Sequence, residues 1–195
     1  MNDSTVKPRQ ICLVGLRCSG KSAVGRALAG LLGWPLYDTD TELTRMHGSI
    51  ASQFARDGEL EFRRREQAVL AECLGRYPLV LSTGGGAVLL AENRALLAGR
   101  HTVWLQAPPI ELARRLMADP VTAGQRPPLL PGTMAEADTG VSCRRWELEM
   151  ERLLLEREPL YAEVARLRID TGSQSPLAAA AIIARDLVTS IGNQP

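Results

Sequence analysis

One short segment near the N-terminus carries the residues whose chemical purpose is clearest. Residues 15–22 (GLRCSGKS) fit G-x-x-x-x-G-K-[ST], the pattern of a phosphate-binding P-loop. The apolar run Ile11 to Val14 precedes the segment, and apolar residues at helical spacing follow it. In such a strand–loop–helix unit, main-chain N–H groups and a helix N-terminus surround an anion. We therefore expect Lys21 to contact the β- and γ-phosphates of a nucleotide, and Ser22 to ligate Mg²⁺.

The length and composition of the chain indicate its domain organisation and the kinds of partner that it does not bind. The chain has 195 residues and a formal net charge of +1, so we predict one domain over 1–195 with no nucleic-acid or membrane partner. Four scattered cysteines without metal-ligand spacing indicate reduced thiols, and no apolar run could span a bilayer, so we expect a cytoplasmic protein. Cys18 either has a lowered thiol pKa, because it lies beside a helix N-terminus, or is simply a small loop residue.

Apolar, strand-like runs alternate with helical patterns along the chain. We predict strands at 10–14, 35–37, 79–82 and 102–105, and a fifth that ends at 168–170. Helices are predicted at 22–32, 41–47, 50–57, 59–75, 93–97, 111–117, 146–158 and 176–191, with breaks at Gly58 and Pro159 and a long loop over 118–141. The charged helix 146–158 is interpreted as a solvated face with alternating charges, and self-association through it is the alternative. This alternation predicts an α/β fold whose parallel sheet has helices on both faces.

Three of the predicted strands end at chemically useful residues. The P-loop follows the first strand, Asp38-Thr39-Asp40 the second and Thr83-Gly84-Gly85-Gly86 the third. Ligands of open α/β sheets bind at the carboxyl ends of the strands, so these segments should converge in one cleft. If the segment 38–40 is extended, both carboxylates lie on the same side of it. The alternative is a pair of solvated turn aspartates.

Taken together, these motifs resemble those of the shikimate kinase family. The shared residues are, in order, 15–22, 38–40, Gly58-Glu59 with Phe62-Arg63 and Glu66, 83–86, Arg126-Pro127, and Arg157 with Pro159-Leu160-Tyr161. The resemblance implies a three-layer α/β/α kinase fold with a five-stranded parallel sheet. Its core would lie at 10–192, its substrate-binding helices at 40–75 and a mobile lid at 118–142. The implied activity is ATP-dependent phosphorylation of the 3-hydroxyl of shikimate, a step of aromatic amino acid biosynthesis, by a monomer.

The resemblance also implies a role for each matched residue. ATP would be bound by Cys18, Ser19, Gly20, Lys21, Ser22, Ala23, Arg115 and Arg126. Shikimate would be bound by Asp40, Arg63, Gly85, Gly86 and Arg157, and Mg²⁺ by Ser22 and Asp38. Catalysis would depend on Lys21, on Asp40 as the group that takes a proton, and on Arg126 as a lid arginine near the transferring phosphates. Taken alone, each of Arg63, Arg115 and Arg126 could be a solvated surface charge.

Two other functions remain open at this point. A gluconate kinase on the same fold would use the same P-loop and lid arginine, although 38–40 and 83–86 favour shikimate. A non-catalytic homologue that binds nucleotide and regulates a partner is the second alternative, and the complete set of charged motif residues argues against it. The sequence also departs from the family pattern, with an extra proline at Pro128, an apparent insertion at 131–142 and no basic residue in 172–176.

Ala23 is a further departure, because kinases with this loop often have threonine at that position. The missing hydroxyl removes one hydrogen bond to the α-phosphate, which is worth about 0.5–1.5 kcal/mol net. Replacing Ala23 by threonine should therefore lower the Michaelis constant for ATP by about two- to tenfold. Initial-rate kinetics at varied ATP measure this constant, and an unchanged value would show that the position is neutral.

Overall fold

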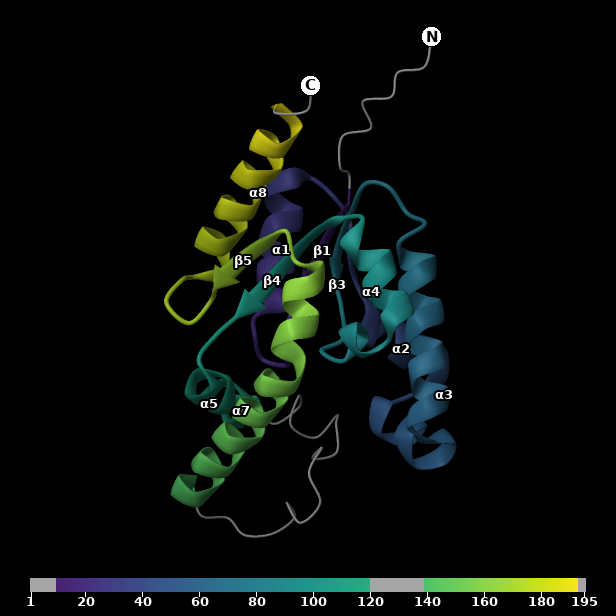
Figure 1. The fold of residues 1–195 in the computed structure, drawn as a ribbon, viewed down its shortest axis with the longest axis vertical. Coiled ribbons are helices and arrows are strands. Elements are labelled where there is room, and N and C mark those ends of the chain that lie inside the picture. The colour runs from purple at the N-terminus through teal and green to yellow at the C-terminus, as the bar shows by residue number, and fades with distance from the viewer. Residues whose placement is uncertain (1–9, 120–138, 193–195) are drawn as a thin grey trace.

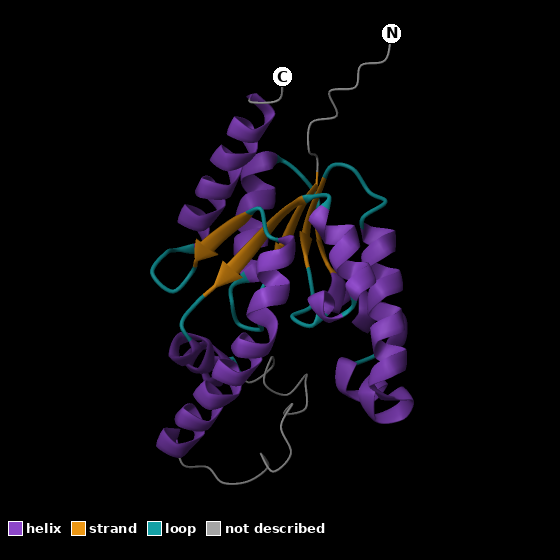
Figure 2. Ribbon diagram, in the orientation of Figure 1, coloured by secondary structure: helices purple, strands orange, loops and turns teal. Residues whose placement is uncertain are grey.

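Five parallel strands form the centre of the computed structural model, which describes residues 10–119 and 139–192 (Figures 1 and 2). They are β1 (Gln10–Val14), β2 (Leu36–Asp38), β3 (Leu79–Ser82), β4 (His101–Gln106) and β5 (Leu167–Asp170). Their order across the sheet is β2-β3-β1-β4-β5, which confirms the predicted five-stranded parallel sheet. The chain crosses from β3 over β1 to β4, so the carboxyl ends of β1, β2 and β3 lie next to one another at a topological switch point.

Helices cover both faces of this sheet. The first face carries α1 (Lys21–Leu32) and α8 (Pro176–Gly192), and the second packs against α2 (Thr39–His47), α3 (Ile50–Cys73), α4 (Ala91–Ala98), α5 (Pro109–Ala118) and α7 (Thr139–Val164), with a short 3₁₀ turn, η1 (Ala87–Leu89). In β1, Ile11 and Leu13 join the core on the first face, whereas Cys12 and Val14 join the core on the second. All four are fully buried, as a parallel strand between two helical layers requires.

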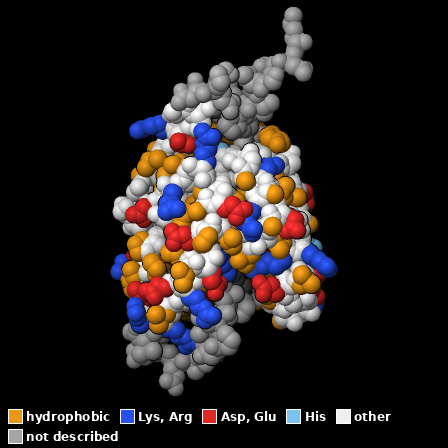
Figure 3. Space-filling view, viewed as in Figure 1, with side chains coloured by type: hydrophobic (Ala, Val, Ile, Leu, Met, Phe, Trp, Pro, Cys, Tyr) orange, Lys and Arg blue, Asp and Glu red, His pale blue; other side chains and the backbone are white. Residues whose placement is uncertain are grey.

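Acidic and basic side chains of the described residues are mixed over the face shown in Figure 3, so neither charge dominates that face. Within 10–119 and 139–192, no helix combines the length and the apolar composition that crossing a bilayer needs.

The predicted helix break at Gly58 is confirmed as a kink, because Gly58 has non-helical angles of φ 77° and ψ 173° that divide α3 into two helical segments. The predicted break at Pro159 is wrong. α7 runs through Pro159 to Val164. Proline removes one helical N–H and usually breaks a helix, but Arg157, Tyr161 and Val164 are all buried around it. Their packing against the rest of the protein keeps the helix continuous.

The N-terminal part of α7 also differs from the sequence interpretation. The helix begins at Thr139, so the predicted loop is wrong for 139–141, and residues 120–138 lie outside the described part of the chain. The predicted solvated face holds only in part, because Glu149 and Arg157 are buried beside the apolar Met150 and Leu153. α7 is therefore a packed structural helix whose buried face includes charged groups.

Candidate active site

The P-loop joins β1 to α1 and surrounds the ammonium group of Lys21. Its Nζ donates hydrogen bonds to the main-chain oxygens of Gly15 (2.9 Å) and Leu16 (2.7 Å). Gly15 has φ 145°, and a Cβ at this position would lie 2.2 Å from the carbonyl oxygen of Leu105 on β4. Only glycine fits there, because β4 passes directly beside the start of the loop. The predicted strand–loop–helix unit is confirmed, with α1 beginning at Lys21.

Cys18 lies in this loop in an unusual backbone conformation. Its φ is 61°, and it is the one non-glycine residue with positive φ among the described residues. Its carbonyl oxygen accepts a hydrogen bond from Nη1 of Arg115 at 3.3 Å. Burial raises the pKa of the Cys18 thiol, although Lys21 and Arg17 act to lower it. Of the two alternatives for Cys18, the lowered pKa does not hold, because the loss of water around the thiolate outweighs the nearby positive charges.

Asp38 connects the P-loop to the start of α2. One carboxylate oxygen, Oδ2, accepts a hydrogen bond from Oγ of Ser22 at 3.0 Å. The other, Oδ1, accepts from the main-chain N–H groups of Asp40 (3.0 Å) and Thr41 (3.2 Å) and so caps the helix. The predicted extended segment is therefore wrong after Asp38, since Asp40 lies in the first turn of α2. Both carboxylates nevertheless line the same cleft.

Thr39 holds the ends of β2 and β3 together. It is buried, and its Oγ1 accepts a hydrogen bond from the main-chain N–H of Gly84 at 2.9 Å. This contact fixes the glycine turn that follows β3 against the aspartate pair. The sequence pattern shows Thr39 only as the residue between two aspartates. No spacing rule distinguishes such a buried threonine from an exposed one.

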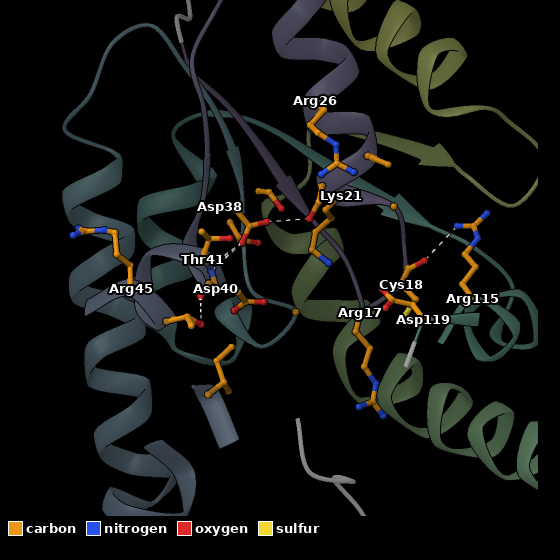
Figure 4. Close-up of a pocket in the computed structure, with 18 residues that line it drawn as sticks. Arg17, Cys18, Lys21, Arg26, Asp38, Asp40, Thr41, Arg45, Arg115 and Asp119 are labelled. Atoms are coloured by element: carbon orange, nitrogen blue, oxygen red, sulfur yellow. Dashed lines mark hydrogen bonds between the residues drawn. The ribbon is translucent and has the colours of Figure 1, made fainter. Parts of the chain in front are cut away.

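A cleft of about 750 Å³ opens where these segments meet (Figure 4). Figure 4 shows Asp38, Asp40 and Thr41 on one side of it, Cys18 and Arg115 on the other, and Lys21 between them. The charged residues that line it are five cations and three carboxylates: Arg17, Lys21, Arg26, Arg45, Arg115, Asp38, Asp40 and Asp119. The excess of positive charge suits a polyphosphate. The predicted convergence of the three strand ends in one cleft is confirmed.

Side chains of α7 hold the glycine turn that follows β3. The carbonyl oxygen of Gly85 accepts hydrogen bonds from Nη1 of Arg157 (3.1 Å) and from the hydroxyl of Tyr161 (2.6 Å). Both donors are buried, and the Tyr161 ring stacks on Trp104 of β4 with ring centres 5.6 Å apart. Arg157 is therefore held in a fixed position at the turn. In the described part of the structure, Nη1 is the nitrogen of its guanidinium that bonds Gly85.

Arg63 approaches the same turn from α3. Its guanidinium donates to the carboxylates of Glu66 (2.8 Å) and Glu59 (3.1 Å), which orient the planar group. A Cβ at Gly86 would lie 2.4 Å from Nη1 of Arg63, so the absence of a side chain there makes room for the guanidinium. Arg63, Gly86 and Arg157 are not among the described residues that line the 750 Å³ cleft, and they adjoin it through Gly85.

Arg115 joins the P-loop to the segment after β5. Besides Cys18, it donates from Nη2 to the carbonyl oxygen of Thr171 at 2.7 Å, and Nε contacts Glu111 at 3.0 Å. The hydroxyl of Thr171 in turn donates to the carbonyl oxygen of Ser19 at 2.9 Å. Arg115 is thus a bridging residue, and the alternative of a plain surface charge on its helix does not hold.

Most of the residues that are expected to bind nucleotide lie at the cleft. Cys18, Gly20, Lys21, Ser22, Ala23 and Arg115 line the cleft, and Ser19 is buried behind it. Arg126 lies outside the described residues. Arg17, Arg26 and Arg45 also line the cleft and were not expected. Arg17 occupies a variable position of the P-loop pattern, so no motif identifies it in advance.

The donors near Ser22 have the right chemistry for Mg²⁺. A hydroxyl and a carboxylate meet at 3.0 Å between Ser22 and Asp38, and oxygen ligands are those that Mg²⁺ prefers. In the described ranges no group of three or more His, Cys, Asp or Glu side chains could hold a metal by itself. The pair fits an ion that is shared with nucleotide phosphates and water, which is how Mg²⁺ usually binds in phosphoryl-transfer sites.

Comparison with known proteins identifies the family. The family model described as "Shikimate kinase" matches residues 17–190. The chain belongs to the shikimate kinase family. A shikimate kinase from Nitrosococcus oceani is 41% identical over 187 residues, which are 95% of this chain and 90% of the relative. A shikimate kinase from Acinetobacter baumannii, solved in complex with shikimate, superposes with a TM-score of 0.81 at 35% identity, covering 95% of this chain and 96% of that one.

A gluconokinase from Sinorhizobium meliloti shares the fold. Its TM-score is 0.61 at 20% identity, covering 96% of this chain and 95% of that one. At this identity the likeness concerns the fold alone. The shikimate kinase family is the one that this chain's own sequence matches over most of its length.

The two roles of Asp38 can be separated by substitution. Asp38→Ala should lower the free energy of unfolding by about 1 kcal/mol, because α2 loses its N-cap. Asp38→Asn keeps a side-chain oxygen that can cap the helix and should lose much less. Urea unfolding followed by circular dichroism measures both values. Equal losses in the two variants would contradict the capping role.

Proposed function

We propose that this chain transfers the γ-phosphoryl group of ATP to the 3-hydroxyl of shikimate, giving shikimate 3-phosphate and ADP. One observation carries the proposal: in a member of the shikimate kinase family, the P-loop, the aspartates after β2 and the arginine-bound glycine turn after β3 meet at one place. A phosphate site and a site for a small hydroxylated carboxylate are thereby adjacent. Phosphoryl transfer needs mainly such positioning and the neutralisation of charge.

The nucleotide half of the site consists of the P-loop and its neighbours. Main-chain N–H groups of the loop and the N-terminus of α1 would receive phosphate oxygens. Lys21, now bonded to two loop carbonyls, lies where its ammonium group can turn to the β- and γ-phosphates. Ser22 and Asp38 would hold Mg²⁺, which when bound neutralises charge on the phosphates. Arg115 would lie on the adenine side, beside the segment after β5.

The shikimate half consists of α2, α3, α7 and the glycine turn. Arg63 and Arg157 would bind the carboxylate, since a guanidinium matches that planar anion with two parallel hydrogen bonds. Gly85 and Gly86 would let the ring approach the main chain. The oxygen of the 3-hydroxyl would attack the γ-phosphorus, and Asp40 would accept the proton of that hydroxyl. At the same time the bond from the γ-phosphorus to the bridging oxygen of ADP would break.

The remaining parts of the proposal depend on the family resemblance alone. Arg126 would neutralise charge on the transferring phosphoryl group, and residue 126 lies outside the described part of the chain. We also propose that 40–75 form the substrate-binding helices and 118–142 a lid within one domain, and that the protein acts as a monomer.

A substrate panel distinguishes this activity from its alternatives. A coupled assay for ADP release should show turnover with shikimate and none with gluconate or nucleoside monophosphates. Turnover of gluconate alone would make the chain a gluconate kinase. Binding of ATP without shikimate-dependent ADP release would make it a nucleotide-binding regulator.

A variant of Lys21 tests whether the turnover comes from this site. Lys21→Met removes the charge while keeping a long side chain, and kcat should fall by about 10²–10³-fold, as when one charge-stabilising donor is removed. Thermal unfolding of the same variant should remain cooperative, which shows that the fold is retained. A kcat within threefold of the wild type would place the phosphate site elsewhere.

A further inference from the structure

The P-loop of this chain is anchored at Arg17 by Glu149, which lies 132 positions away on α7 and is not among the described residues that line the cleft. The guanidinium of Arg17 pairs with Oε1 of Glu149 on α7, and it lies over the ring of Trp146, 5.3 Å from the ring centre. Figure 4 shows the Arg17 side chain pointing away from Lys21 and toward α7. The side chains of Arg17 and Glu149 are 8% and 1% exposed, so water screens their attraction little.

The residue next to Arg17 is the one under backbone strain. Cys18 has φ 61°, a conformation that glycine adopts freely and that costs other residues free energy. Such strain persists only where the surroundings hold the residue in place. Here the structure supplies a hold on each side: Glu149 binds the side chain before Cys18, and Arg115 binds the carbonyl oxygen of Cys18 itself.

α7 is well placed to serve as a fixed anchor. Glu149, Leu153, Arg157 and Tyr161 follow one another at intervals of four, and all are buried on one stripe of the helix. The last two bind the Gly85 carbonyl, and the main chain at Gly85 lies against the P-loop, because a Cβ there would be 3.2 Å from the main-chain N of Arg17. α7 therefore contacts the P-loop through Glu149, and it contacts the adjacent glycine turn after β3 through Arg157.

We propose that Glu149 is a positioning residue for nucleotide binding, which holds the strained P-loop in its phosphate-binding conformation through Arg17. The inference rests on the nucleotide half of the proposed function. Without the ion pair, the loop relaxes at Cys18 into conformations in which its main-chain N–H groups no longer point toward a common phosphate site. The apparent dissociation constant for nucleotide then rises by the inverse of the fraction of loops that remain competent.

The test compares nucleotide and shikimate affinities in Glu149→Gln. Isothermal titration with ADP and Mg²⁺ should show a dissociation constant about five- to tenfold above the wild type. Shikimate, titrated without nucleotide, should bind within twofold of the wild type. Arg17→Gln removes the ion pair from the other side and should behave in the same way, which keeps the test valid if one variant fails to fold. Glu147→Gln is the matched control, because Glu147 lies on the same helix but pairs with Arg144, whose side chain is 62% exposed. This substitution should leave both constants unchanged.

A second background isolates the strain at Cys18. Cys18→Gly removes the conformational cost, so adding Glu149→Gln to it should raise the dissociation constant for ADP by less than twofold. An equal effect of Glu149→Gln in both backgrounds would overturn the inference. So would an equal loss of ADP and shikimate affinity, which indicates general loosening of α7, or tighter ADP binding, which indicates that Glu149 withholds Arg17 from the phosphates. Failure of the wild-type protein to bind ADP would overturn the proposed function, and this inference with it.

Discussion

The close approach of the P-loop to the glycine turn after β3 is the constraint on which the rest of the site depends. β1 and β3 are adjacent parallel strands, so the segments that follow them leave the sheet side by side. At Gly85 the two main chains are so close that a side chain would press on the main-chain N of Arg17 and the carbonyl oxygen of Gly15. Because of this contact, the P-loop and the proposed carboxylate-binding turn lie directly against each other.

Polar side chains hold this contact in place from three directions. Thr39 holds the turn from the start of α2, Arg157 and Tyr161 hold it from α7, and Arg63 fills the space beside Gly86. Each of these four side chains makes at least one hydrogen bond, as burial favours. The result is a site whose two halves are both attached to α7, so that movement of this helix would be felt at the nucleotide and at the second substrate.

Much of the fold could be predicted from the sequence because its strands are short, continuous apolar runs ending at motif residues. The P-loop, the aspartate pair and the glycine run each follow a strand, and parallel topology alone brings them together. The errors have identifiable physical causes. Pro159 carries a strong local signal for a helix end, but tertiary packing of the buried residues around it outweighs that signal. At Gly58 the local signal does produce non-helical angles and a kink. Asp38 starts its helix early because its carboxylate caps two N–H groups, which the spacing of two aspartates does not reveal.

Parts of the site lay beyond any sequence pattern. The ion pair between Arg17 and Glu149 joins residues 132 positions apart, and neither belongs to a motif as a charged residue. The thiol pKa of Cys18 depends on burial, which only the fold determines. The proposed roles of Arg63 and Arg157 come from the resemblance to a family. Arg63, in the run 63–65 of three arginines, would otherwise indicate a solvated helix face.

The proposed site depends most on Arg63 and Arg157, which are held at the glycine turn and would recognise a carboxylate beside the phosphate site. The most direct measurement compares kcat/KM for shikimate with kcat/KM for the analogue whose carboxylate is replaced by a carboxamide. The wild-type protein should prefer shikimate by at least about a hundredfold, because a charge-assisted pair is lost on each arginine. In Arg63→Gln and in Arg157→Gln this preference should fall at least about tenfold. A preference that survives both substitutions, or is absent from the wild-type protein, would contradict the account.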